Sequence, residues 1–105
     1  MGISYKKLKE IQNRQMTEMS RMTPENVKLF DQISGIARRT DADERTQEEW
    51  ILAEGKAIVQ AQRDGQSARE RYGADLEQDI HARLNAGAGA PSSSSVSVGR
   101  NSSKK

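Results

Sequence analysis

The sequence predicts an all-α fold: a small bundle of four to five helices followed by a disordered, low-complexity tail. No window sustains the alternation of β-branched and polar residues that is typical of strands. Apolar residues instead recur at three- and four-residue steps along most of the chain. With 105 residues, of which 33% are hydrophobic, the chain is expected to form one domain with a thin core. We place the helical domain at residues 1–86 and the tail at residues 87–105.

The first helix is predicted from about Ser4 to Arg21. It carries one loose apolar stripe, formed by Tyr5, Leu8, Ile11, Met16, Met19 and Met22. The next residues end this helix and begin another. Thr23 can cap a helix, and Pro24 suits a first helical position because no amide hydrogen bond is lost there. The charge of Glu25 complements the positive end of the second helix.

The second helix, about Pro24 to Arg38, has the most regular amphipathic face of the chain. Its apolar residues are Val27, Phe30, Ile33 and Ala37, with Leu29 and Ile36 beside them. A third helix begins either at Asp43 or at Thr46, since Thr46 and Glu49 have the spacing of a capping box. It continues to Arg63.

Residues 63–76 are predicted to form a corner made of a helix end, a short helix and a new helix. Gly65 is placed to end the third helix in left-handed backbone. Ser67 and Glu70 have the spacing of a second capping box, which starts a short helix of little more than one turn. Tyr72 is expected to pin this turn to the bundle.

Gly73 then ends the short helix, and we expect it to have left-handed backbone. Asp75 is expected to cap a final helix, whose apolar residues align at four-residue steps: Leu76, Ile80 and Leu84. DNA-reading helix-turn-helix modules have a similar rhythm, but their second helix is long enough to lie in the major groove. Residues 61–84 also carry five acids against four arginines, the wrong balance for contacting phosphates. The motif therefore predicts a structural corner.

The sequence offers little for catalysis, metals or cofactors. It has no cysteine and a single histidine, His81. His81 shares a helix face with Glu77, and a lone pair of this kind indicates an ordinary surface contact more than a metal site. No pair of acids, no serine–histidine–acid pattern and no glycine-rich phosphate loop points to chemistry. We expect a protein that is not an enzyme, with no catalytic residue, no metal and no cofactor.

Two features are candidates for partner binding. Met16, Met19 and Met22 lie three residues apart, and methionine adapts to irregular partners. They are interpreted first as core residues and alternatively as a groove or a helix-docking face. Trp50 is of a residue type common at interfaces, although we expect it to be mostly buried here.

Charge is distributed unevenly along the chain. Residues 1–39 carry eight lysines and arginines against four acids, whereas residues 40–86 carry six against eleven. The two halves are expected to dock on each other inside the fold, and the alternative is a polar partner surface. Nucleic-acid contacts, if they exist, are expected from the basic first helix, at Lys6, Lys7, Lys9 and Arg14, together with the weakly cationic tail.

Two stretches of the sequence carry a resemblance to a known family. One is Met22-Thr23-Pro24-Glu25-Asn26 leading into Phe30. The other is Ala61-Gln62-Arg63-Asp64-Gly65-Gln66-Ser67-Ala68, followed by Tyr72-Gly73-Ala74-Asp75. They resemble a family of short all-helical bacterial domains of unknown function. Its members occur mainly in Gram-positive bacteria, as stand-alone proteins near PadR-type regulators or as cytoplasmic parts of small membrane proteins.

The resemblance covers about residues 5–84. It implies a compact all-helical fold with corner residues that serve the structure: Gly65, Ser67, Tyr72, Gly73 and Asp75. It implies no catalytic residue. The chain departs from the family pattern because its middle helix is more polar and no membrane segment follows.

Together these observations predict a small cytoplasmic accessory or regulatory protein that binds another, unidentified protein. One alternative is a nucleic-acid-associated accessory factor of plasmid or phage type. A second is a self-associating helical protein, a homo-oligomer with the methionine face of the first helix as its seam. No apolar run in the sequence is long enough to span a bilayer.

Overall fold

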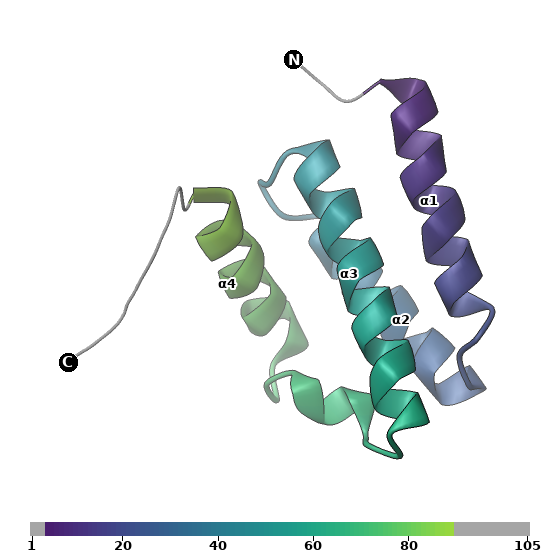
Figure 1. The fold of residues 1–105 in the computed structure, drawn as a ribbon. Coiled ribbons are helices and arrows are strands. Elements are labelled where there is room, and N and C mark those ends of the chain that lie inside the picture. The colour runs from purple at the N-terminus through teal and green to yellow at the C-terminus, as the bar shows by residue number, and fades with distance from the viewer. Residues whose placement is uncertain (1–3, 90–105) are drawn as a thin grey trace.

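The computed structural model describes residues 4–89, and Figure 1 shows their arrangement. The elements are α1 (Tyr5–Met19), α2 (Pro24–Ala37), α3 (Glu44–Arg63), the 3-10 helix η1 (Ala68–Arg71) and α4 (Leu76–Gly89). The described residues contain no strand, so the all-α prediction is confirmed. α3 contacts each of the other elements, with α1 along one of its sides, and α2 also packs against α4.

Side-chain caps begin the four α-helices. The caps are Ser4, Thr23, Asp43 and Asp75, whose side chains accept hydrogen bonds from the amides of Lys7, Asn26, Thr46 and Gln78 at 3.1 to 3.3 Å. Such a cap stabilises a helix by about 1 kcal/mol. Of the two starts proposed for α3, the structure has the one at Asp43. Thr46 lies inside the helix and donates its amide to that cap.

The end of α3 has the expected left-handed glycine. Gly65 has φ +73°, and the backbone makes the two hydrogen bonds of a Schellman motif. Its amide donates to the carbonyl of Gln62 at 3.1 Å, and the amide of Gln66 donates to that of Ala61 at 2.8 Å. These bonds satisfy carbonyls that the helix end would otherwise leave unpaired.

Two predictions about the corner were wrong. Among the described glycines only Gly65 has a positive φ, so Gly73 is not left-handed. Ser67 makes no capping hydrogen bond with its side chain, so the second capping box does not form. At this bend, long side chains form hydrogen bonds with the backbone, and Gly73 does not need a positive φ.

Arg69 and Asp79 provide that hold. The Arg69 guanidinium donates to the carbonyls of Tyr72, Gly73 and Ala74 at 3.0 to 3.2 Å. Asp79, one turn into α4, accepts the amide of Gly73 at 2.8 Å. The amide and the carbonyl of Gly73 are therefore both paired with side chains. The local sequence pattern did not predict these two contacts.

A second group of side chains, the corner network of Glu54, Arg71, Tyr72, Asp79 and Arg83, joins α3, η1 and α4. The Tyr72 hydroxyl donates to Glu54 at 2.6 Å, and Arg71 contacts the same carboxylate oxygen at 3.3 Å. Arg83 lies over the Tyr72 ring, 5.0 Å from its centroid, and donates to Asp79 at 3.0 Å. Burial, followed by the hydrogen bond to Glu54, raises the pKa of Tyr72.

The core is one cluster formed by α2, α3, the corner and α4, and α1 packs against it with the partly buried Met19. Its buried residues are Leu29, Phe30, Ile33, Ile36, Ala37, Ile51, Ile58, Ala61, Ala68, Tyr72, Ile80 and Leu84. Tyr72 thus pins the corner to the bundle, as expected. Gly55 lets α3 approach α2, because a Cβ atom there would lie 3.1 Å from the Phe30 ring.

Two predicted boundaries differ from those observed. α1 ends at Met19, so Met22 lies in the turn to α2. α4 continues to Gly89 and crosses the boundary placed after residue 86. The rest of the predicted tail, residues 90–105, lies outside the described residues.

Candidate functional site

A groove opens between α1 and α2, and we call it the α1–α2 groove. Its volume is about 260 Å³, and its lining residues are Gln12, Gln15, Met16, Met19, Phe30, Asp31, Ser34 and Arg38. The apolar part comes from Met16 and Met19 on α1 and from the buried ring of Phe30 on α2. Polar side chains surround this part, which is the arrangement of a small protein-docking site.

Met16, Met19 and Met22 differ in how far they are buried. Met19 and Met22 are partly buried against the core. Met16 is 65% exposed, so the interpretation of all three as core residues was wrong for Met16. Tyr5, 75% exposed, is the other large hydrophobic residue exposed in the described part of the chain. α1 therefore has an apolar margin beside its buried face.

Tyr5 and Met16 lie on the same side of α1. The residues Tyr5, Lys9, Gln12, Met16 and Met19 follow one another at steps of four, three, four and three, and we call them the α1 stripe. This spacing places them in one line along a helix. The buried face of α1, with Ile11 and Gln15, lies next to the stripe, so the stripe runs along the rim of the α1–α2 groove.

Beneath the groove lies a set of polar side chains, the inner network of Gln15, Arg38 and Glu48, which ties α1, α2 and α3 together. Arg38 donates two hydrogen bonds to the Glu48 carboxylate, both at 2.9 Å, and a third to the Gln15 side-chain oxygen at 3.1 Å. The Gln15 amide donates to the carboxylate at 3.0 Å and to the Glu48 carbonyl at 2.9 Å. Gln15 and Glu48 are only 5% and 3% exposed.

The ionisation of Glu48 is set by these partners. Burial acts to raise its pKa, but the hydrogen bonds from Arg38 and Gln15 and the charge of Arg38 outweigh burial. The pKa of Glu48 therefore lies below its ordinary value. The hydrogen bond to Glu48 is the main reason that the pKa of Arg38 is raised, against the opposing effect of burial. The pair is charged at neutral pH and fixes one wall of the groove.

Sequence reasoning missed the inner network and the α2 side of the groove. Gln15 and Glu48 stand within or beside apolar stripes, and hydrophobic periodicity treats such residues as surface positions. For Gln15 the available signal was its place between Ile11 and Met19, four residues from each, which puts it on the buried face of the helix with Ile11. Asp31 and Ser34 join the site because α2 supplies its second wall, which is a tertiary property.

Trp50 does not join the methionines. It is partly buried against the core and is not among the residues that line the α1–α2 groove. The two candidate partner-binding features predicted from the sequence therefore do not form one surface.

The basic residues of α1 are exposed. Lys6, Lys7, Lys9 and Arg14 all face solvent, and within residues 4–89 only Lys7 makes an ion pair, with Glu10 at 3.8 Å. The expected docking of the basic and acidic halves does occur at the end of α2. There Arg38 pairs with Glu48 at 2.9 Å and Arg39 with Glu77 at 3.0 Å. The cations of α1 take no part in it.

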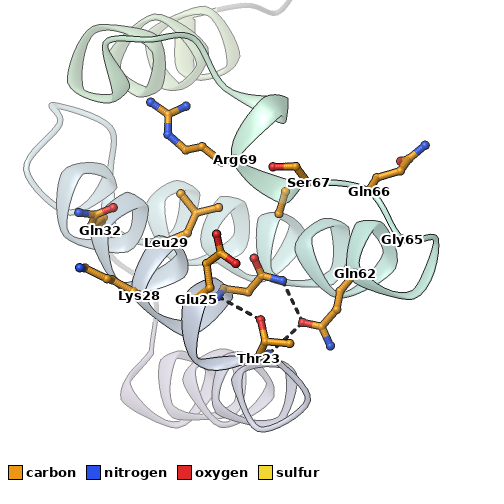
Figure 2. A pocket seen from close by; sticks show the side chains of 12 residues that line it. Thr23, Glu25, Lys28, Leu29, Gln32, Gln62, Gly65, Gln66, Ser67 and Arg69 are labelled. Carbon is orange, nitrogen blue, oxygen red and sulfur yellow. Dashed lines mark hydrogen bonds between the residues drawn. The ribbon is translucent and has the colours of Figure 1, made fainter.

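A larger cleft, of about 550 Å³, lies between α2 and the corner (Figure 2). Its best-positioned polar group is Gln62, which accepts from the Thr23 amide and the Asn26 side chain, both at 2.9 Å. Its own amide donates to the Arg21 carbonyl at 2.9 Å. Arg69, on the opposite side of the cleft, is held by the corner carbonyls. These groups serve the fold and leave few fixed partners for a ligand.

The remaining sequence candidates have ordinary roles. His81 lies 3.2 Å from Glu77 on the surface of α4. Within the described residues, no three histidine, aspartate or glutamate side chains gather so that they could hold a metal ion. η1 spans only Ala68–Arg71, too short for a helix that reads the major groove.

Comparison of the chain with protein-family models, with curated proteins and with solved structures found no match. The resemblance to the bacterial helical family accordingly stays a prediction. Among the described helices, none combines the length and the apolar character needed to cross a membrane.

Proposed function

We propose that this protein is a small, non-enzymatic accessory protein of the cytoplasm that binds another protein through the α1–α2 groove. The observation that carries the proposal is the position of Met16. Met16 is 65% exposed, yet it lines the groove together with Met19 and the buried Phe30.

The exposed apolar side chain of Met16 favours binding of a partner at the groove. A partner that covers exposed apolar area stabilises the complex. The gain is about 25 cal/mol for each Å² of apolar area removed from water. Methionine is suited to the rim of such a site because its unbranched, polarisable side chain adapts to different shapes. The inner network holds the groove walls in place before a partner arrives, which reduces the entropy cost of binding.

Site-specific photo-crosslinking tests the proposal. A photoreactive phenylalanine analogue replaces Met16, and in a control protein it replaces Gln78, an exposed residue of α4 that does not line the groove. We expect ultraviolet light to give a crosslinked protein product in cells with the probe at position 16. Equal products from both positions, or none from position 16, would contradict the proposal.

The exposed cations of α1 favour a second candidate function, binding of nucleic acid. Lys6, Lys9 and Arg14 make no ion pair within the described residues, and each faces solvent. Phosphate contacts weaken steeply as salt rises, whereas apolar docking does not. Titration with a short DNA duplex at 50 and at about 200 mM salt separates the two functions. Salt-sensitive binding that Lys6→Glu and Lys9→Glu reduce would favour nucleic acid.

A further inference from the structure

We propose that the partner in the α1–α2 groove is a second copy of this chain, bound through α1 in an antiparallel, two-fold symmetric dimer. This inference rests on the proposed function in taking the groove as a protein-docking site, and it names a second copy, in place of a different protein, as the occupant. Three properties of the groove support it: the spacing of the α1 stripe, the position of α1 and the placement of unpaired charges.

The α1 stripe has the repeat of a helix-pairing seam. Tyr5, Lys9, Gln12, Met16 and Met19 alternate steps of four and three residues, as do the contact positions of coiled coils. α1 also lies at one edge of the bundle (Figure 1), where a second helix has access to it. A second helix can therefore pack along the stripe.

The charges decide between the two orientations. In a parallel pair, Lys9 of one copy would lie beside Lys9 of the other, and like charges directly opposite are destabilising. In an antiparallel pair centred near Gln12, Lys9 lies at the level of Met16 of the other copy. Met16 shares the groove with Asp31 and with Arg38, and because Arg38 is already paired with Glu48, Asp31 is the charge left for the lysine.

Lys9 and Asp31 are both available for that contact. Both are exposed, and neither forms an ion pair within the described residues of its own chain. Two-fold symmetry forms the contact twice, once on each side of the axis. α1 would then be covered on the side where Tyr5 and Met16 are now exposed.

The expected dimer is weak. α1 contains 15 residues, which corresponds to roughly 22 Å at 1.5 Å per residue. One helix of this length buries less surface than a standard stable interface. The protein is therefore expected to be a monomer when dilute and to dimerise as its concentration rises.

Sedimentation equilibrium over a wide concentration series tests the dimer with the full chain. We expect the apparent mass to rise from 11.7 kDa toward twice that value. Met16→Glu should abolish the rise, since it places a charge in the seam. Gln78→Glu, which adds the same charge on α4, should leave the rise unchanged. The circular dichroism of both variants should match that of the parent, because both positions are exposed.

Charge reversal tests the orientation. Lys9→Glu and Asp31→Lys should each weaken dimerisation by about tenfold, and the double variant should regain the parent's dimerisation. The double variant keeps the net charge of the parent, so a general charge effect cannot explain recovery. A double variant no better than either single one would overturn the antiparallel pairing.

The outcomes separate this inference from the function on which it rests. A monomer at every concentration, together with a crosslink from position 16 to a different polypeptide, overturns the dimer and leaves the proposed function standing. A dimer that Met16→Glu does not affect overturns the dimer through α1. If position 16 also crosslinks no more than position 78, the proposed function falls with it.

Discussion

Two polar networks hold this bundle, and they differ in what surrounds them. In the inner network of Gln15, Arg38 and Glu48, the carboxylate side chain is only 4% exposed, whereas the Arg38 side chain that pairs with it is 44% exposed. In the corner network, the Glu54 carboxylate side chain is 12% exposed and Arg71 is 36% exposed, so the two networks differ in the burial of the carboxylate and not in that of the arginine.

The stability lost when a polar contact is broken depends on the group that is left without a partner. Removal of the arginine from the inner network leaves a buried carboxylate without its cation, which is costly. Removal of a partner from the corner network leaves groups that solvent and neighbouring side chains can satisfy. The wall of the α1–α2 groove therefore depends on one arginine more than the corner depends on any single side chain.

The largest expected effect is that of Arg38→Ala. It leaves the buried Glu48 carboxylate without its cation, but Arg38 is itself 44% exposed and water can enter in its place, so the free energy of unfolding should fall by about 2 kcal/mol. Arg39→Ala is the matched control. Arg39 pairs with Glu77 at the surface, where both side chains are more than half exposed, so its loss should change stability by less than about 1 kcal/mol. Urea denaturation measures both variants, and equal losses would contradict the distinction.

Acid should act on the same interaction to a smaller degree. The pKa of Glu48 is lower in the folded protein than its ordinary value of 4.5, so the folded state favours the ionised form. The stabilising contribution is fully present above that ordinary value and is lost as the pH falls through the folded pKa. Unfolding followed between pH 6 and pH 2 should show this loss.

Glu48→Gln is the control for this pH dependence. It removes the titrating group, so its stability curve should fall less steeply with acid than that of the parent. Parallel curves would show that other carboxylates cause the acid sensitivity.

A smaller effect should distinguish the two glycines of the corner. Gly65→Ala places a Cβ atom on left-handed backbone with φ +73° and should destabilise the protein by about 1 kcal/mol. At Gly73 a Cβ atom would meet Asp79 at an ordinary 3.8 Å, so Gly73→Ala should cost less than about 0.5 kcal/mol. Thermal melts of the two variants side by side test this order, and a reversed order would restore the left-handed assignment of Gly73.

The corner network itself should show a comparably modest effect. Tyr72→Phe keeps the buried ring and removes the hydroxyl that donates to Glu54 at 2.6 Å. The expected loss is about 1 kcal/mol, because Arg71 still contacts that carboxylate. A loss as large as that of Arg38→Ala would contradict the proposed difference between the two networks.

Sequence reasoning succeeded where structure depends on near neighbours. The helix starts at Ser4, Thr23 and Asp75 and the glycine end at Gly65 follow from residues within a few positions, and the structure has all four. Gly73 failed because its backbone depends on Arg69 and Asp79, side chains that reach it from two different elements.

The candidate site was only half predictable for the same reason. The methionine row on the first helix is visible in the sequence, but its division into an exposed Met16 and a partly buried Met19 depends on how α1 packs against α3. The opposite wall of the groove comes from α2, and the local sequence pattern does not show which side chains of two helices line the same groove. Asp31, the proposed contact of Lys9, therefore could not be found from spacing.

The most direct test of the account is a series of two-dimensional amide NMR spectra of labelled protein at rising concentration. If α1 pairs with a second copy, gradual shifts are expected along the α1 stripe and at Asp31, with the amides of α4 unchanged. Spectra that stay the same at every concentration, or that shift mainly at the corner, would contradict the claim that the α1–α2 groove is the docking surface for a second copy.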